Sequence, residues 1–224
     1  MRAFIFAFLL AGGGSAAAGG PELPAPPAQA AGECPADMER VAGFCMDRYE
    51  APNKKDADPL AARTAPEGEA WCAARGKRLC TEDEWVRACG GPADLPYPYG
   101  VVYRPRACND GKTWKAPDWK KLAKYPAPEG KAEAERLYQA DPAGSNPLCV
   151  SEEGVYDLAG NAAEWVARSR PNAHNHAHVL KGCYWSGCFG GAKPGCAFVN
   201  PAHPGTFRTY EAGFRCCLTP AAAE

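Results

Sequence analysis

Residues 154–165 have the sequence GVYDLAGNAAEW, one of the few short apolar and aromatic runs in the second half of the chain. It mixes apolar and aromatic residues with Asp, Gly and Asn over a short length, which is typical of a brief strand joined to a turn. Residues 179–185 and 213–218 are further short apolar or aromatic runs. Residues 90–154, by contrast, are rich in Pro, Gly, Asp and Lys and show little periodic patterning. We therefore expect long irregular loops there, with one exposed helix around residues 132–139.

Two helices are expected ahead of this stretch, each opened by a capping box. Thr64 is followed three residues later by Glu67, which predicts a helix over residues 65–75. Thr81 and Glu84 have the same spacing and predict a second, shorter helix directly after them.

The first residues have the pattern of a targeting segment. Arg2, the apolar residues 3–11 and a small-residue site predict a secretory signal peptide over residues 1–18. Its apolar run is about half of the roughly 20 residues that cross a bilayer, and nothing later is comparably apolar, so we expect no membrane span. We expect a Pro-, Ala- and Gly-rich leader at residues 19–33, one domain at residues 34–218 and a tail at residues 219–224.

Twelve cysteines stand out in the composition of this chain of 224 residues. In an oxidising compartment neighbouring thiols form disulfides, so we expect a secreted or periplasmic protein whose cysteines are mainly structural. We also expect the protein to be a monomer. Cys34 and Cys45 flank a segment with Gly43 as a turn residue, which predicts a small hairpin closed by a disulfide. The 25 basic and 26 acidic residues balance, so charge gives no support for nucleic acid or an anionic membrane as the partner.

Four segments, taken together and in this order, carry a family resemblance. They are FCMDRYE (residues 44–50), GKRLCTEDEW (76–85), GVYDLAGNAAEW (154–165) and GFRC (213–216). With them the chain resembles the formylglycine-generating enzyme, or sulfatase-modifying-factor, family over roughly residues 34–218. The resemblance implies an α+β fold related to the C-type lectin fold. It is an irregular, disulfide-rich domain with few short helices packed on a small twisted mixed sheet.

The resemblance also implies disulfides between the early helices and the C-terminal strands. Two pairs match family bridges, Cys72 with Cys216 and Cys89 with Cys196. Cys80 stands where the family usually has Pro, and Cys217 adds a second C-terminal thiol, so a Cys80–Cys217 bridge is expected beside them. Elimination then pairs Cys108 with Cys149.

The segment from Asp157 to Glu164 is the best candidate for a metal ligand. In the resembling family this turn holds calcium through groups that match the side chains of Asp157 and Glu164 and the main-chain oxygens of Gly160 and Ala162. Such oxygens are the ligands that calcium requires. The alternative is that Asn161 and Glu164 only hydrogen-bond the turn.

A second calcium site of the family would begin at Asn109 and Asp110. The partner residues of that site cannot be placed in residues 111–121.

Cys183 and Cys188 are the candidates for catalysis. Formylglycine formation in the family uses two cysteines five apart that bind copper, because thiolates suit Cu(I). The spacing fits here, but the register does not: Cys183 falls on a position that is usually Gly, and Cys188 precedes Cys196 by eight residues instead of five. A plain structural disulfide between Cys183 and Cys188 explains the same residues.

Alternating histidines form one more candidate metal site. His174, His176 and His178 would project to one face of an extended segment, where imidazoles could bind zinc, copper or iron. The alternative is an exposed polar loop.

Two classes of function follow. The first is a calcium-stabilised binding or accessory module with a degenerate catalytic site, which binds an exported protein or a glycan through its variable loops. The second is a copper-dependent oxidase of the formylglycine-generating type that acts on a Cys in an exported protein. The residues favour the module.

Overall fold

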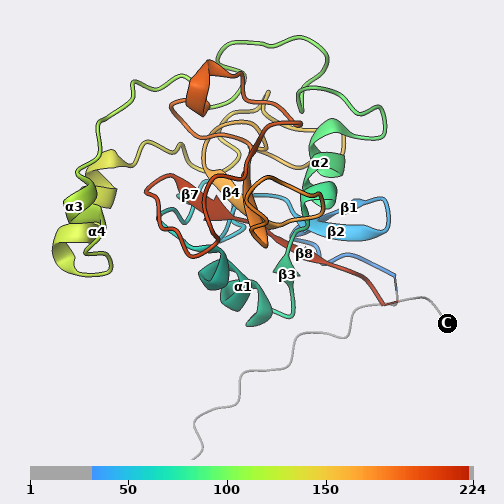
Figure 1. Cartoon of the computed structure of the whole chain (residues 1–224). Coiled ribbons are helices and arrows are strands. Elements are labelled where there is room, and N and C mark those ends of the chain that lie inside the picture. Colours follow the sequence, from blue (N-terminus) through green and yellow to red (C-terminus); the bar gives the residue numbers. More distant parts are fainter. Residues whose placement is uncertain (1–31, 222–224) are drawn as a thin grey trace, which may run out of the picture.

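Two four-stranded β-sheets and four short α-helices build residues 32–221, the part of the chain that the computed structural model describes (Figure 1). The expected signal peptide at residues 1–18 lies outside the described residues. Nearly all of the expected leader and the last residues of the tail lie outside them as well. No helix of the described part is long and apolar enough to cross a membrane.

The first sheet is antiparallel and has the strand order β1-β2-β8-β3. Its strands are β1 (Met38–Val41), β2 (Phe44–Asp47), β8 (Cys216–Leu218) and β3 (Arg78–Leu79). β1 and β2 form the hairpin expected from the sequence, and a disulfide joins Cys34 to Cys45 beside it. The C-terminal strand β8 lies between β2 and β3, so the two ends of the domain meet in one sheet.

The second sheet is mixed and has the order β6-β5-β4-β7. Its strands are β6 (Val199–Asn200), β5 (His178–Lys181), β4 (Ala163–Ala167) and β7 (Ala212–Phe214). β4 runs antiparallel to β5 and parallel to β7. We call residues 154–165 the signature stretch and its turn, residues 157–162, the signature turn. The stretch ends in the central strand β4, and the turn precedes that strand.

The two early helices begin where their capping boxes place them. α1 (Ala65–Ala73) is capped by Thr64 and Glu67, and α2 (Glu82–Gly90) by Thr81 and Glu84. In each, the threonine side chain accepts a hydrogen bond from the glutamate's backbone N–H while the glutamate accepts one from the threonine's.

The middle of the chain is largely irregular, but it holds two helices where one was expected. α4 (Pro128–Leu137) begins four residues before the predicted start, because a proline suits the first turn of a helix. α3 (Trp119–Leu122) was not predicted; the Asp118 side chain accepts hydrogen bonds from the backbone of its first turn. α3 and α4 lie together on one side of the molecule, left in Figure 1, opposite α2. We call residues 119–137 the arm.

Buried tryptophans form the centre of two hydrophobic clusters. Trp165 and Trp185 lie with Phe214 in the cluster under α1, and Trp85 lies with Leu158 in the cluster under α2. Three disulfides cross this core, namely Cys72–Cys216, Cys80–Cys217 and Cys89–Cys196, with sequence separations of 144, 137 and 107 residues. Cys108–Cys149 closes part of the middle region. The structure thus joins each of the five pairs derived from the sequence.

Candidate functional site

The signature turn is held by backbone contacts that only glycine permits at its centre. Gly160 has φ +87°, and a Cβ there would lie 2.4 Å from the carbonyl oxygen of Asn109. Its N–H donates to the carbonyl of Gly182, while the N–H of Asn161 donates to that of Asn109. The turn is therefore fixed against two other loops at once.

A buried ion pair anchors the strand that follows the turn. The Arg215 guanidinium donates to both carboxylate oxygens of Glu164, at 2.8 and 2.6 Å, and both side chains are essentially inaccessible to solvent. Trp85 Nε1 donates to the same carboxylate at 2.8 Å. Arg215 also donates to the main-chain oxygens of Asp47 and Tyr156. These contacts satisfy a fully buried charge, which is otherwise costly.

Two more buried carboxylates lie beside this pair. Glu50 Oε1 accepts from the Asn161 side chain at 2.9 Å, and Asp157 Oδ2 accepts from Gly144 N at 2.7 Å. Glu50 Oε2 and Asp157 Oδ1 have no hydrogen-bond partner among the described residues. Burial and the charge of Asp157 raise the pKa of Glu50 well above its usual range. Burial raises the pKa of Asp157 to about 6, although Gly144 N–H and Arg215 act in the opposite direction.

The residues expected to bind calcium fit that role only in part. Asp157 keeps one free oxygen, but both oxygens of Glu164 are already bound by Arg215 and Trp85. The described residues contain no group of three or more His, Cys, Asp or Glu placed to hold a metal ion. The geometry instead has the features of the alternative, in which Asn161 and Glu164 hydrogen-bond the turn.

Asn109 and Asp110, expected in a second calcium site, lie against the first turn. The Asn109 side chain donates to the Asn161 side chain at 3.0 Å. Asp110 accepts from the Tyr103 hydroxyl at 2.9 Å, and burial raises the pKa of both groups, that of Tyr103 to about 12. The two segments that the sequence treats as separate sites thus form one hydrogen-bonded unit.

Cys183 and Cys188 form a disulfide, with Cα atoms 4.9 Å apart. Cys183 lies two residues after the end of β5, has φ +63° and is buried, while Cys188 is partly exposed. Between them Tyr184 and Gly187 exchange backbone hydrogen bonds in a tight turn. No cysteine of residues 32–221 is free. The thiolates that Cu(I) requires are therefore not available while this bond is closed.

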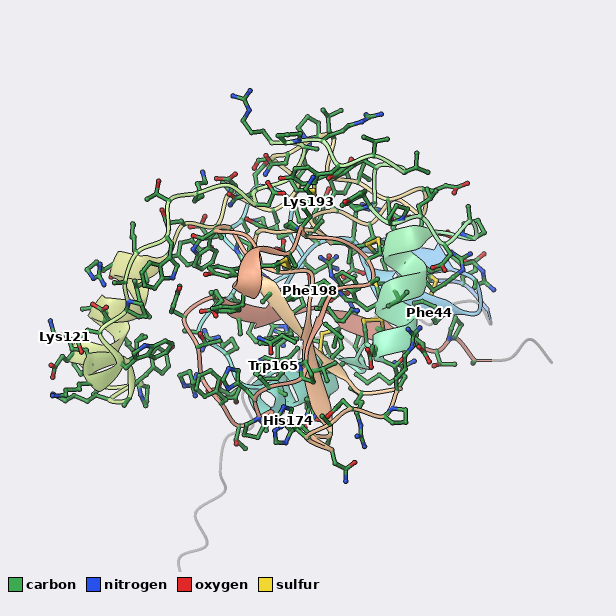
Figure 2. The ribbon with its side chains drawn as sticks, turned by 45° about the horizontal axis from the view of Figure 1, so that its top comes forward. Phe44, Lys121, Trp165, His174, Lys193 and Phe198 are labelled. Atoms are coloured by element: carbon green, nitrogen blue, oxygen red, sulfur yellow. A yellow bond between two sulfur atoms is a disulfide. The ribbon has the colours of Figure 1, made fainter. Side chains whose placement is uncertain are left out.

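A buried carboxyl faces the space beside this disulfide. Glu211, Tyr184 and Asn200 line the same small cavity as the two cysteines. Burial raises the pKa of Glu211 to about 7, and its closest partner is the Thr209 hydroxyl, which opposes the shift. Phe198, labelled in Figure 2, also lines the cavity. From the segment 196–200, Phe198 and Asn200 present an aromatic ring and an amide to this cavity.

The three alternating histidines do not share a face. The rings of His174 and His176 stack with centroids 5.7 Å apart, whereas His178, the first residue of β5, contacts Glu69 on α1 at 2.8 Å. The segment before β5 is a turn rather than an extended strand, so the period of two does not apply. A fourth histidine, His203, stacks on Phe207. Its pKa is lowered, mainly by burial and to a smaller extent by the charge of the nearby His176.

Sequence reasoning did not find Glu50 and Arg215 as the partners of this turn. Both residues belong to the quoted segments, FCMDRYE and GFRC, in which charged residues stand next to apolar and aromatic ones. Because a charge in a core-facing motif needs a partner, that pattern was the available signal.

Known proteins resemble this chain in sequence and in fold. A model of the family described as the sulfatase-modifying factor enzyme 1-like domain matches residues 38–220. A bovine protein named inactive C-alpha-formylglycine-generating enzyme 2 is 33% identical over 120 residues, which are 53% of this chain and 36% of that protein. The chain thus spans about a third of the length of that relative.

Two solved structures share the fold. CarF superposes with a TM-score of 0.54 at 12% identity, over 79% of this chain and 86% of its own. PvdO from Pseudomonas aeruginosa superposes with a TM-score of 0.52 at 19% identity, over 79% and 80%. At these identities the likeness concerns the fold alone.

Proposed function

This chain belongs to the sulfatase-modifying factor enzyme 1-like domain family, and from that membership we propose that it is a non-catalytic accessory module that binds an exported partner. The chain keeps the fold of the family, and a buried ion pair and core disulfides stabilise it here. A rigid scaffold with long loops suits binding, because loops can vary while the core is kept.

The observation that carries this proposal is the closed Cys183–Cys188 disulfide. A copper-thiolate oxidase needs these sulfurs as thiolates, and the register of the two cysteines differs from that of the family. The cavity beside them is small, and Phe198, Asn200, Glu211 and the single basic residue Lys181 line it. These features support a binding role over the oxidase.

The sequence relatives support the same choice. The bovine relative is named as an inactive formylglycine-generating enzyme. It matches about half of this chain, so its name is support for the proposal and does not assign the activity. Six disulfides among the described residues indicate an oxidising compartment. The partner is accordingly an exported protein or glycan.

Aldehyde formation tests the proposal against the oxidase. The purified protein is incubated with Cu(I), oxygen, a thiol reductant that supplies the two further electrons for the reduction of oxygen to water, and a peptide containing Cys-x-Pro-x-Arg, and the product is analysed by mass spectrometry. We expect no aldehyde above the level of a Cys183→Ser/Cys188→Ser variant. Aldehyde made by the native protein and lost in that variant would overturn the module and establish the oxidase.

Calcium at the signature turn is a separate part of the proposal. The free oxygen of Asp157 supports it, and the occupied carboxylate of Glu164 opposes it. Thermal unfolding in calcium and in EDTA distinguishes the two. A Tm that rises with calcium and no longer does so in Asp157→Asn supports calcium binding, since a ligand of the native state stabilises it. An unchanged Tm removes calcium and leaves the module.

A further inference from the structure

Three shallow concavities lie in a row between the arm, residues 58–63 and α1. Their volumes are about 290, 420 and 420 Å³. Tyr125 lines both the first and the second, and Arg63 lines both the second and the third. Because Tyr125 links the first to the second and Arg63 links the second to the third, the second adjoins both others, and a chain-like ligand suits the three better than a single small molecule.

Each concavity combines an aromatic ring with an arginine. In the first, Trp119 is 53% exposed and the Arg208 guanidinium lies 4.5 Å from the Tyr125 ring. The second is lined by Tyr125 and by Arg63. In the third, the Arg75 guanidinium lies 3.5 Å from the Trp71 ring. Aromatic rings offer flat apolar faces, and guanidinium groups bind carboxylates through two parallel hydrogen bonds.

Basic groups near this surface are free to take an anionic ligand. Arg63, Arg75 and Lys131 form no ion pair with any described carboxylate, whereas Arg208 is held by Glu67. Residues 112–131 hold six lysines and two acidic residues, and three of these lysines, Lys112, Lys121 and Lys124, are paired with Asp141, Asp118 and Glu129. Lys121 lies at the outer side of the arm (Figure 2). The cations that remain for an anionic ligand at the concavities are therefore Arg63, Arg75 and Lys131.

Two carboxylates in the second concavity narrow the class of ligand. Asp58 and Glu135 line it and pair with no described basic residue. A peptide whose side chains are all carboxylates offers these two groups no side-chain donor, and a flat lipid surface would not reach into the concavity. Sugar hydroxyls, in contrast, donate hydrogen bonds to carboxylates. The faces of sugar rings carry C–H groups that pack on aromatic rings such as Tyr125.

We propose that this row of concavities binds an oligosaccharide that carries acidic sugars, with sugar faces on Trp119 and Tyr125 and sugar carboxylates on Arg63 and Arg75. The proposal rests on the proposed binding function and names its partner class. In the second concavity, between the other two, Asp58 and Glu135 accept hydrogen bonds from sugar hydroxyl groups.

Calorimetric titration of the full chain tests this assignment. The probes are hexagalacturonate and, as the neutral control, cellohexaose. We expect hexagalacturonate to bind more tightly and to lose affinity as salt rises. Arg75→Met, an exposed position, and Arg63→Met should each weaken it about tenfold, which corresponds to loss of one charge-assisted contact. Arg104→Met removes an exposed arginine outside the concavities and should change nothing.

The outcomes separate this proposal from the proposed function. No binding of hexagalacturonate, or binding that neither arginine variant weakens, overturns the oligosaccharide site and leaves the module intact. A hexaglutamate peptide that binds as tightly as hexagalacturonate, with the same dependence on Arg63 and Arg75, also overturns it. Aldehyde formation would instead remove the module, whatever the sugars do.

Discussion

Arg215 is the single charged side chain on which the signature turn depends most among the described residues. It is completely buried, and it connects the carbonyl of Asp47 in β2 with the carbonyl of Tyr156 and the carboxylate of Glu164, which lie before and after the turn. A guanidinium can do this because it has five donors in a fixed plane. A lysine at this position would leave several of these acceptors without a partner.

Removal of one partner of this ion pair is expected to destabilise the fold strongly. Glu164→Gln leaves Arg215 buried and without its counter-charge, which costs about 3 to 5 kcal/mol. Asp83→Asn is the matched control, since its pair with Arg170 is exposed and contributes about 0 to 1 kcal/mol. Urea unfolding of both variants measures the difference. A loss of less than about 1 kcal/mol for Glu164→Gln would show that the pair does not anchor the turn.

Asp157 is expected to lower stability as the pH rises from about 4 to about 6. Its pKa is raised to about 6 from 3.8, so the native state holds its proton more tightly than the unfolded chain does. Its stabilising contribution is complete below about pH 4 and is lost as the pH passes about 6.

Asp157→Asn tests this sign, because asparagine tolerates the positive φ and keeps the acceptor for Gly144. The variant should gain about 2 kcal/mol relative to the native protein between pH 4 and pH 7. Urea unfolding at each pH measures it. Glu211 titrates in both proteins and cancels in the difference, whereas the pKa of Glu50 falls in the variant because the charge of Asp157 is gone, a change of the same sign. A pH-independent difference would contradict the raised pKa.

At the scale of elements, the two capping boxes explain why α1 and α2 begin where they do. Thr64→Ala removes the side-chain acceptor for the Glu67 N–H and should destabilise the protein by about 1 kcal/mol, whereas Thr64→Ser should retain most of the stability. Thr206→Ala, at an exposed loop position, is the control. Chemical unfolding compares the three. Equal stability of Thr64→Ala and Thr206→Ala would mean that packing alone fixes the start of α1.

The sequence predicted local features of the fold better than distant ones. Capping chemistry depends on residues three apart, so α1 and α2 were found, and the hairpin at Gly43 followed from its turn. α4 was misplaced by four residues because its start depends on Pro128 and not on a capping side chain. The parallel pairing of β4 with β7 joins residues far apart in the chain, and no periodicity within either strand specifies it.

In the candidate site, too, local features could be predicted from the sequence and contacts between distant segments could not. Asp157 and Glu164 were recognised from one short segment, but their real neighbours, Glu50 and Arg215, come from opposite ends of the domain. The concavities beside the arm were not found at all, because Arg63 and Tyr125 lie outside every motif. Loops that carry no motif meet only in the folded chain.

At the scale of the whole molecule, disulfides between distant segments are expected to dominate stability. Cys89–Cys196 has a separation of 107 residues, and Cys183–Cys188 has one of 5. The chain-entropy estimate is about 5 kcal/mol for the first and about 2 kcal/mol for the second. Replacing each pair by alanines and comparing guanidinium unfolding tests this order. A larger loss of unfolding free energy on replacing the Cys183–Cys188 pair than on replacing the Cys89–Cys196 pair would contradict this order.

Anaerobic Cu(I) titration of the purified protein, followed by disulfide mapping of its peptides, tests whether Cys183 and Cys188 form a structural disulfide in a non-catalytic module. We expect Cys183 and Cys188 to be recovered in one disulfide-linked peptide and no copper to bind with one-to-one stoichiometry. The opposite result is free thiols at both positions that together hold one copper ion tightly. That result would contradict a binding module and place the chain among the oxidases of its family.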